Sequence, residues 1–192
     1  MSALILTLPT TPDHPDRSTY PHLEEAAAGR PFDQVGVEFC PSQPTNQRGL
    51  TRLVLYPGVI NDDADEFFAW GYCWLLAAAM NEATGWPYGL VERWREGAWE
   101  WTHVGVITPA GCFLDIRGCH DRDDLTATLV TAYGTPTRIR TGTFADLRQA
   151  MRMSEDTTPD WWLGTLRAPI LTDVVRYFAA HLLTQHARRE TA

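Results

Sequence analysis

The sequence contains no lysine: all sixteen of its basic residues are arginine. This absence excludes mechanisms in which a lysine amine forms a Schiff base or acts as the general base. Acidic residues number twenty-four, and the formal net charge is -8. A nucleic-acid groove or an anionic membrane surface would require clustered positive charge. We therefore expect no nucleic acid and no membrane as the main partner.

Long apolar runs are also absent. The longest uncharged stretch, residues 67–81, is shorter than the ~20 residues needed to cross a bilayer. The first residues have no basic region ahead of an apolar segment, so no secretory signal is expected. The four cysteines are widely spaced and form no CxxC pair, which is typical of thiols in a cytoplasmic protein. These features predict a cytoplasmic location and leave export by a route other than Sec open.

The sequence has enough apolar residues for one domain. A chain of 192 residues that is 44% hydrophobic can enclose a single core. Residues 1–33, rich in proline, threonine, aspartate and histidine, are interpreted as an extended arm lying on the domain. Residues 61–118 hold the candidate catalytic core, and residues 125–133 fit either a helix or a strand. Residues 171–189 have the apolar spacing of a C-terminal helix.

A central helix is predicted to begin at Cys73, directly after Gly71 and Tyr72. The acidic stretch before it, residues 61–66, supplies several candidate N-caps. Residues 73–80 are apolar on all sides, which predicts that the helix is buried in the middle of the fold. Gly85, followed closely by Pro87, is the expected stop signal.

A β-hairpin is predicted next. Residues 100–107 and 112–116 have strand patterns, and residues 108–111 (TPAG) between them form a turn. His103 lies on the first strand and Asp115 on the second. The short turn would therefore bring these two side chains close together.

The predicted elements place a thiol, an imidazole and a carboxylate in one constellation. The dipole and the unpaired amides at a helix start favour a thiolate, as does a neighbouring protonated histidine. Cys73 would be the nucleophile, His103 would transfer the proton and Asp115 would orient the imidazole. The backbone amide of Cys73 would supply part of an oxyanion hole. This chemistry needs no cofactor.

Two segments resemble known hydrolases. Residues 71–74 (GYCW) resemble the Gly-x-Cys-Trp at the nucleophile helix of papain-type peptidases. Residues 103–115 (HVGVITPAGCFLD) resemble the histidine strand of NlpC-like cell-wall endopeptidases, whose third polar residue also follows the histidine by twelve positions. The resemblance covers roughly residues 61–118. It implies an α+β, papain-like fold, with a nucleophile helix packed on an antiparallel sheet and additions at both termini.

The chain departs from both families around the nucleophile. Papain-type enzymes place a glutamine six residues before the cysteine to complete the oxyanion hole, and this chain has Phe67 there. Asn61 is the nearest upstream amide, so Asn61 and Tyr72 are the candidate oxyanion and supporting residues. NlpC-like enzymes have aspartate and serine beside the cysteine, where this chain has Tyr72 and Trp74.

The resemblance implies a cysteine hydrolase that cleaves an amide or isopeptide bond through a thioester intermediate. A peptidase, an amidase and a deamidase all fit, and the substrate would be a protein or peptide-like molecule. Trp70, Trp74 and Trp101 would line the substrate groove. The oligomeric state is not predicted.

Two alternatives remain at this point. The first is a catalytically inactive binding or accessory module with the same papain-like fold, related to a toxin, a phage protein or an effector. The second is a zinc site formed by His103, Cys112, Cys119 and His120. Their spacing matches no compact zinc motif, so no metal is expected.

Overall fold

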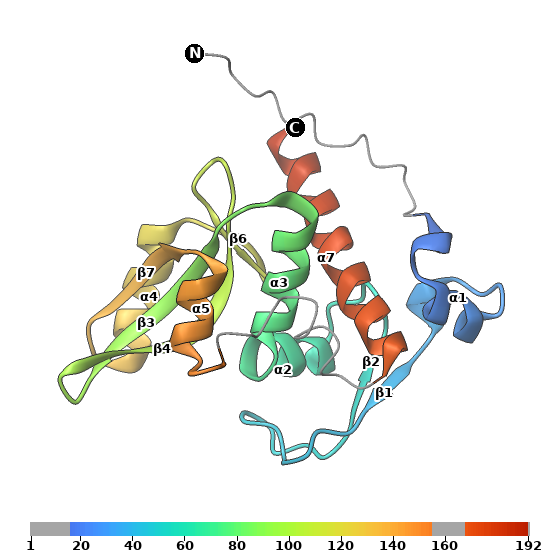
Figure 1. Cartoon of the computed structure of the whole chain (residues 1–192), viewed down its shortest axis with the longest axis horizontal. Helices are drawn as coiled ribbons and strands as arrows, with labels where there is room; N and C mark the ends of the chain where they lie inside the picture. The colour runs from blue at the N-terminus through green and yellow to red at the C-terminus, as the bar shows by residue number, and fades with distance from the viewer. Residues whose placement is uncertain (1–15, 155–167, 192) are drawn as a thin grey trace.

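The computed structural model describes residues 16–154 and 168–191 (Figure 1). Within these ranges, six α-helices and a five-stranded antiparallel sheet form an α+β fold, accompanied by a two-stranded sheet. The helices are α1 (Pro21–Ala27), α2 (Asp62–Trp70), α3 (Cys73–Thr84), α4 (Arg122–Tyr133), α5 (Phe144–Ala150) and α7 (Pro169–Glu190). The strands are β1 (Val37–Phe39), β2 (Leu53–Leu55), β3 (Tyr88–Arg95), β4 (Ala98–Ile107), β5 (Phe113–Asp115), β6 (Gly118–His120) and β7 (Thr137–Gly142). None of the helices in the described ranges has the length and hydropathy of a membrane span.

Helix α3 lies at the centre of the fold, with the sheet on one side and α7 on the other (Figure 1). Residues 75–80 of this helix are almost completely buried, as their all-round apolar pattern predicted. The helix ends at Gly85, which adopts the left-handed conformation with φ of 70°. That conformation is accessible to glycine at little cost, so the predicted stop signal is confirmed.

The acidic stretch before the nucleophile forms a helix of its own. Helix α2 ends at Trp70, and the chain turns at Gly71, where φ is -145° and ψ is -59°. The amide of Tyr72 donates to the carbonyl oxygen of Phe67 at 2.7 Å, which closes the turn. The chain then begins a new helix, so Cys73 is the first residue of α3.

The larger sheet has the strand order β6-β5-β4-β3-β7, and every neighbouring pair is antiparallel. The predicted hairpin is confirmed as β4 and β5. These two strands pair only at Val106 with Leu114 and at Ile107 with Phe113. The first part of β4 therefore extends beyond the end of β5.

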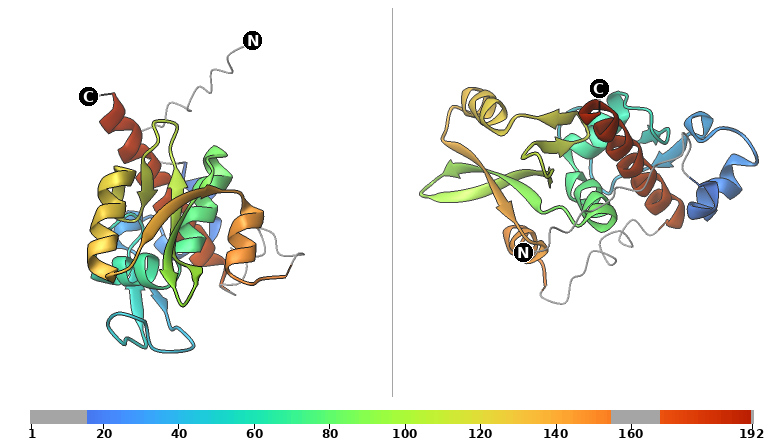
Figure 2. Two further views of the ribbon diagram at one scale, coloured as in Figure 1. Left: turned by 90° about the vertical axis from the view of Figure 1, so that its left-hand side faces the viewer. Right: turned by 90° about the horizontal axis from the view of Figure 1, so that it is seen from above.

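Helices cover both faces of this sheet (Figure 2). One face packs on α3 in the main hydrophobic core, and α5 contributes Leu147 to the same core. The opposite face packs on α4 through Leu125 and Leu129, which contact a cluster formed by Val91, Ile107, Phe113 and Ile139. The segment that fitted either a helix or a strand is thus part of α4, which covers this second face.

A β-bulge lies immediately before His103. The register pairs Val91 with His103 but Glu92 with Trp101, which leaves Thr102 as the extra residue. The Thr102 hydroxyl donates to the carbonyl oxygen of Val91 at 3.3 Å. Because side chains alternate along a strand, the extra residue places Trp101 and His103 on opposite faces.

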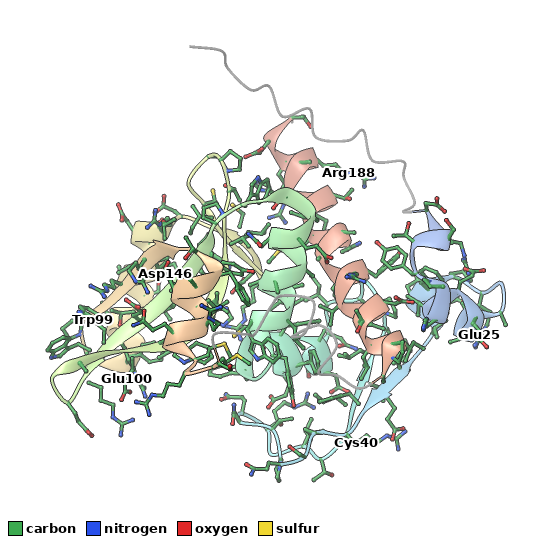
Figure 3. All side chains as sticks on the ribbon, in the orientation of Figure 1. Glu25, Cys40, Trp99, Glu100, Asp146 and Arg188 are labelled. Atoms are coloured by element: carbon green, nitrogen blue, oxygen red, sulfur yellow. The ribbon has the colours of Figure 1, made fainter. Side chains whose placement is uncertain are left out.

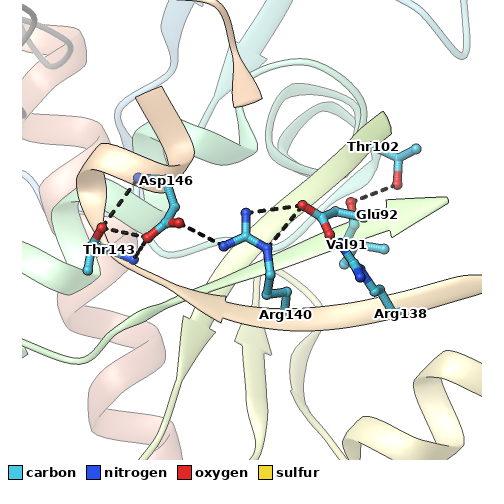
Figure 4. Close-up of polar contacts among 7 residues, drawn as sticks. All are labelled: Val91, Glu92, Thr102, Arg138, Arg140, Thr143 and Asp146. Carbon is cyan, nitrogen blue, oxygen red and sulfur yellow. Dashed lines mark hydrogen bonds and ion pairs between the residues drawn. The ribbon is translucent and has the colours of Figure 1, made fainter. Parts of the chain in front are cut away.

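A buried carboxylate joins β3 to β7 and, through β7, to α5 (Figure 4). Glu92 accepts from Arg138 Nε at 2.7 Å and from Arg140 Nη2 at 3.1 Å. Arg140 also donates to Asp146 of α5 at 2.8 Å. Asp146 forms a reciprocal capping box with Thr143 at the start of that helix. The ionic cluster therefore fixes α5 next to the edge strand of the sheet.

The described part of the predicted arm packs on the C-terminal helix. Residues 16–33 include the helix α1. Its N-cap residue provides no side-chain hydrogen bond. Instead, Asp173 of α7 accepts from the amides of His22 at 2.8 Å and Leu23 at 3.1 Å. Residues 1–15 of the arm lie outside the described residues.

Candidate active site

The thiol of Cys73 lies at the start of α3 and is buried, with 5% of the residue exposed. The preceding residue, Tyr72, makes no side-chain cap hydrogen bond. In α2, by contrast, Asn61 caps the first turn by accepting from the amide of Ala64 at 2.9 Å. The first-turn amides of α3 are therefore not occupied by a capping side chain of Tyr72, and the partial positive charge of the helix start can act on a Cys73 thiolate.

His103 and Asp115 are hydrogen-bonded across the β4–β5 hairpin. His103 Nε2 lies 2.9 Å from Asp115 Oδ2, and both side chains are largely buried. The imidazole also contacts the ring of Phe113, with ring centroids 5.9 Å apart. An ionised carboxylate only accepts, so Nε2 must carry the hydrogen of this bond. In the neutral imidazole, Nδ1 is then the nitrogen with a free lone pair.

Nδ1 of His103 is buried and has no hydrogen-bond partner of normal geometry among the described residues. The imidazole of His103 lies beside the thiol of Cys73, and the two side chains interact electrostatically. Burial opposes the charged imidazolium, but interactions with Cys73 and Asp115 outweigh burial and raise the pKa of His103 to about 10. The structure thus brings together the three residues that the sequence placed in one constellation.

Asp115 has a second histidine on its other oxygen. Its Oδ1 accepts from the amide of Arg117 at 2.9 Å and lies 3.2 Å from His120 Nε2. Burial alone would raise the pKa of Asp115, but hydrogen bonds from His103 and His120 hold it well below its usual range. Asp115 is therefore an anion that bridges two histidines.

The sequence interpretation missed this role of His120, which it considered only as a zinc ligand. In the described residues, no group of three or more histidine, cysteine, aspartate or glutamate side chains is arranged to hold a metal. The sequence offered only the short connection after Asp115, which does not by itself define the strand register. This connection folds β6 back on β5, so that His120 pairs with Phe113 and shares a face with Asp115.

No protein-family model, curated protein or solved structure matches the chain. The assignment of a function therefore depends on the geometry of these residues. It also depends on what the surrounding side chains contribute to them.

The candidate oxyanion residues have structural roles in the described fold. Phe67, which occupies the position of the papain-type glutamine, is 1% exposed and stacks on Tyr72, with centroids 4.6 Å apart. It offers no donor. Asn61 uses its Oδ1 to cap α2, which leaves its amide nitrogen for any other role. The participation of Asn61 and Tyr72 in an oxyanion hole stays a prediction.

The three candidate groove tryptophans lie in different environments. Trp70 is 38% exposed, and the guanidinium carbon of Arg117 lies 5.6 Å from its ring centroid. Trp74 and Trp101 are partly buried and pack against the main core. Of the three, Trp70 presents the most surface to a ligand. Their joint role as a groove stays a prediction.

Proposed function

We propose that this protein is a papain-like cysteine hydrolase that cleaves an amide or isopeptide bond in a protein or peptide-like substrate. The observation that supports this proposal best is the environment of His103. One ring nitrogen is hydrogen-bonded to a buried carboxylate, the other is buried without a hydrogen-bond partner of normal geometry among the described residues, and the imidazole interacts with a thiol at a helix start. These are the parts that nucleophilic catalysis by cysteine requires.

The first half of the reaction forms a thioester. His103 Nδ1 accepts the proton of the Cys73 thiol, and the sulfur attacks the carbonyl carbon of the substrate. The negative charge moves to the carbonyl oxygen, which the amide of Cys73 stabilises. The tetrahedral intermediate then collapses, the C–N bond breaks, and the leaving amine takes the proton from His103. Asp115 keeps the imidazole oriented and stabilises its positive charge throughout.

The second half releases the product. His103 Nδ1 accepts a proton from a water molecule, and the resulting hydroxide attacks the thioester carbon. The C–S bond breaks, the acid product leaves, and His103 returns the proton to the sulfur. No cofactor enters either half. The same sequence yields a peptidase, an amidase or a deamidase, according to which amine leaves.

The test measures the alkylation of Cys73 by iodoacetamide between pH 5 and pH 9, with mass spectrometry resolving the four cysteine-containing sites. Because Cys73 is buried, access limits its absolute rate, so the readout is the shape of the pH profile. We expect wild-type Cys73 to stay reactive at pH 6, because His103 supplies positive charge to the thiolate. His103→Ala should lower the rate at pH 6, relative to the rate of the same variant at pH 9, on the order of tenfold. His22→Ala, a change at an exposed histidine on α1, is the control.

The contrary result has a specific meaning. If wild type and His103→Ala give the same profile, and both follow a small-molecule thiol, Cys73 is not an activated nucleophile. The chain would then be a non-catalytic module on the same fold. Phe67 favours that alternative, because it supplies packing where an oxyanion donor was expected.

A further inference from the structure

The carboxylate of Asp115 receives three donors and is almost excluded from water, with 7% of the residue exposed. His103 occupies Oδ2, while the amide of Arg117 and His120 Nε2 both face Oδ1. The carboxylate is ionised, because its pKa is held low. His120 Nε2 must therefore be the protonated nitrogen in this contact.

The strand register explains why His120 reaches Asp115. Across the β5–β6 pair, the residue opposite Asp115 is Gly118, which has no side chain and adopts φ of 102°. His120 is two residues further along β6, and its side chain therefore lies on the same face as Asp115. It is the first side chain of β6 on that face.

The guanidinium of Arg117, which also lies nearby, is paired with another carboxylate. The guanidinium of Arg117 makes a bidentate ion pair with Asp65 of α2, at 2.7 and 2.9 Å. Arg117 thus offers Asp115 only its backbone amide. Without His120, Oδ1 would keep a single donor, and the carboxylate would be less restrained against rotation about its bond to Cβ.

We propose that His120 is a positioning residue, which holds the plane of the Asp115 carboxylate so that Oδ2 stays directed at His103. This inference rests on the proposed function, because orientation of His103 matters only if His103 activates Cys73. His120 itself touches neither the nucleophile nor the substrate carbonyl in this mechanism. Its effect passes through Asp115 to the imidazole.

The experiment compares His120→Gln with His120→Met, two side chains of similar length of which only glutamine keeps an N–H donor. The readout is again the pH profile of Cys73 alkylation, with His103→Ala and His22→Ala alongside. We expect His120→Met to lower the rate at pH 6 about fivefold, the effect of losing one hydrogen bond. His120→Gln should remain within about twofold of wild type if one restored donor recovers most of that effect.

Urea unfolding of each variant separates positioning from stability. A His120→Met protein that is less stable but keeps the wild-type alkylation profile would show a purely structural residue and overturn the inference. An equal loss of rate in His120→Gln and His120→Met would also overturn it, because the N–H donor would then be irrelevant. If instead His103→Ala has no effect, the proposed function fails and this inference with it.

Discussion

At the residue scale, the buried carboxylate of Asp115 controls the candidate site. Three donors surround it, and two of them are imidazoles. A buried anion is costly unless its hydrogen bonds are made, and here they are. The same contacts that orient His103 therefore also contribute to the stability of the folded chain.

We expect Asp115→Asn to lower the free energy of unfolding at pH 7 by about 1.5–3 kcal/mol, the range for hydrogen bonds to a charged group. The pKa of Asp115 is lower in the folded than in the unfolded chain. Its stabilisation is therefore fully present above the unfolded pKa of ~4, and is lost as the pH falls through the lower folded pKa. Urea unfolding at pH 7, 5 and 3 should show the gap to wild type narrowing at pH 3.

Asp123→Asn, at an exposed position in the first turn of α4, is the matched control. It should change the free energy by less than about 1 kcal/mol. A gap between wild type and Asp115→Asn that stays constant from pH 7 to pH 3 would contradict the assigned low pKa.

The sequence predicted the contact between His103 and Asp115 but not the contact of His120, for a physical reason. His103 and Asp115 lie on one hairpin, so their spacing and the turn between them predicted their contact. His120 was missed because its contact depends on the register of β5 and β6, which is set by a two-residue connection. A short strand with little apolar pattern leaves such a register unreadable.

At the element scale, two departures from regular structure position the site. The turn at Gly71 starts a new helix at Cys73, and the bulge at Thr102 turns His103 to the face opposite Trp101. The sequence placed Cys73 at a helix start after Gly71, and the structure confirms this, but the sequence showed neither the separate helix α2 nor the bulge. The apolar run crosses the helix break without interruption, and the strand pattern continues through the bulge. Both result from packing, which local propensity does not encode.

The edge of the sheet nearest α5 depends on Glu92. Its side chain is 7% exposed and contacts two arginines of β7. Glu92→Gln removes the charge that both guanidinium groups face, and we expect it to cost about 3 kcal/mol in the free energy of unfolding, as for a broken buried ion pair. Urea unfolding followed by tryptophan fluorescence measures this loss.

The hairpin formed by β3 and β4, to which Glu92 belongs, also provides the matched control. Glu96, at the tip between β3 and β4, pairs with Arg95 at 3.6 Å, but its side chain is 82% exposed. The neighbouring Trp99 and Glu100 are seen at the far end of this hairpin in Figure 3. Glu96→Gln should cost less than about 1 kcal/mol. Similar losses in the two variants would show that the buried ionic cluster adds no more than a surface pair.

At the scale of the whole molecule, segments that are distant in sequence pack on one another. The buried central helix and the hairpin that follows it could be predicted from periodicity and turn residues, whereas the α+β arrangement of this helix on an antiparallel sheet was implied by the resemblance of residues 61–118 to known hydrolases. The packing of α1 on α7 could not be predicted from the sequence. It joins residues about 150 positions apart, and each of the two segments has a pattern that fits many partners.

Asp173 is the residue that makes this long-range contact specific. It is 6% exposed and takes the place of the missing N-cap side chain of α1. Asp173→Ala would leave the amides of His22 and Leu23 without their acceptor. We expect the free energy of unfolding to fall by about 1–2 kcal/mol, the usual cost of removing a helix cap.

Hydrogen exchange should become faster in α1 before it changes in the central sheet, because segments open as separate units when their tertiary contacts weaken. Asp33→Ala, at an exposed aspartate of the same segment, should leave the exchange of α1 near wild type. Equal protection of α1 in the Asp173→Ala and wild-type proteins would mean that apolar packing alone holds α1 on α7.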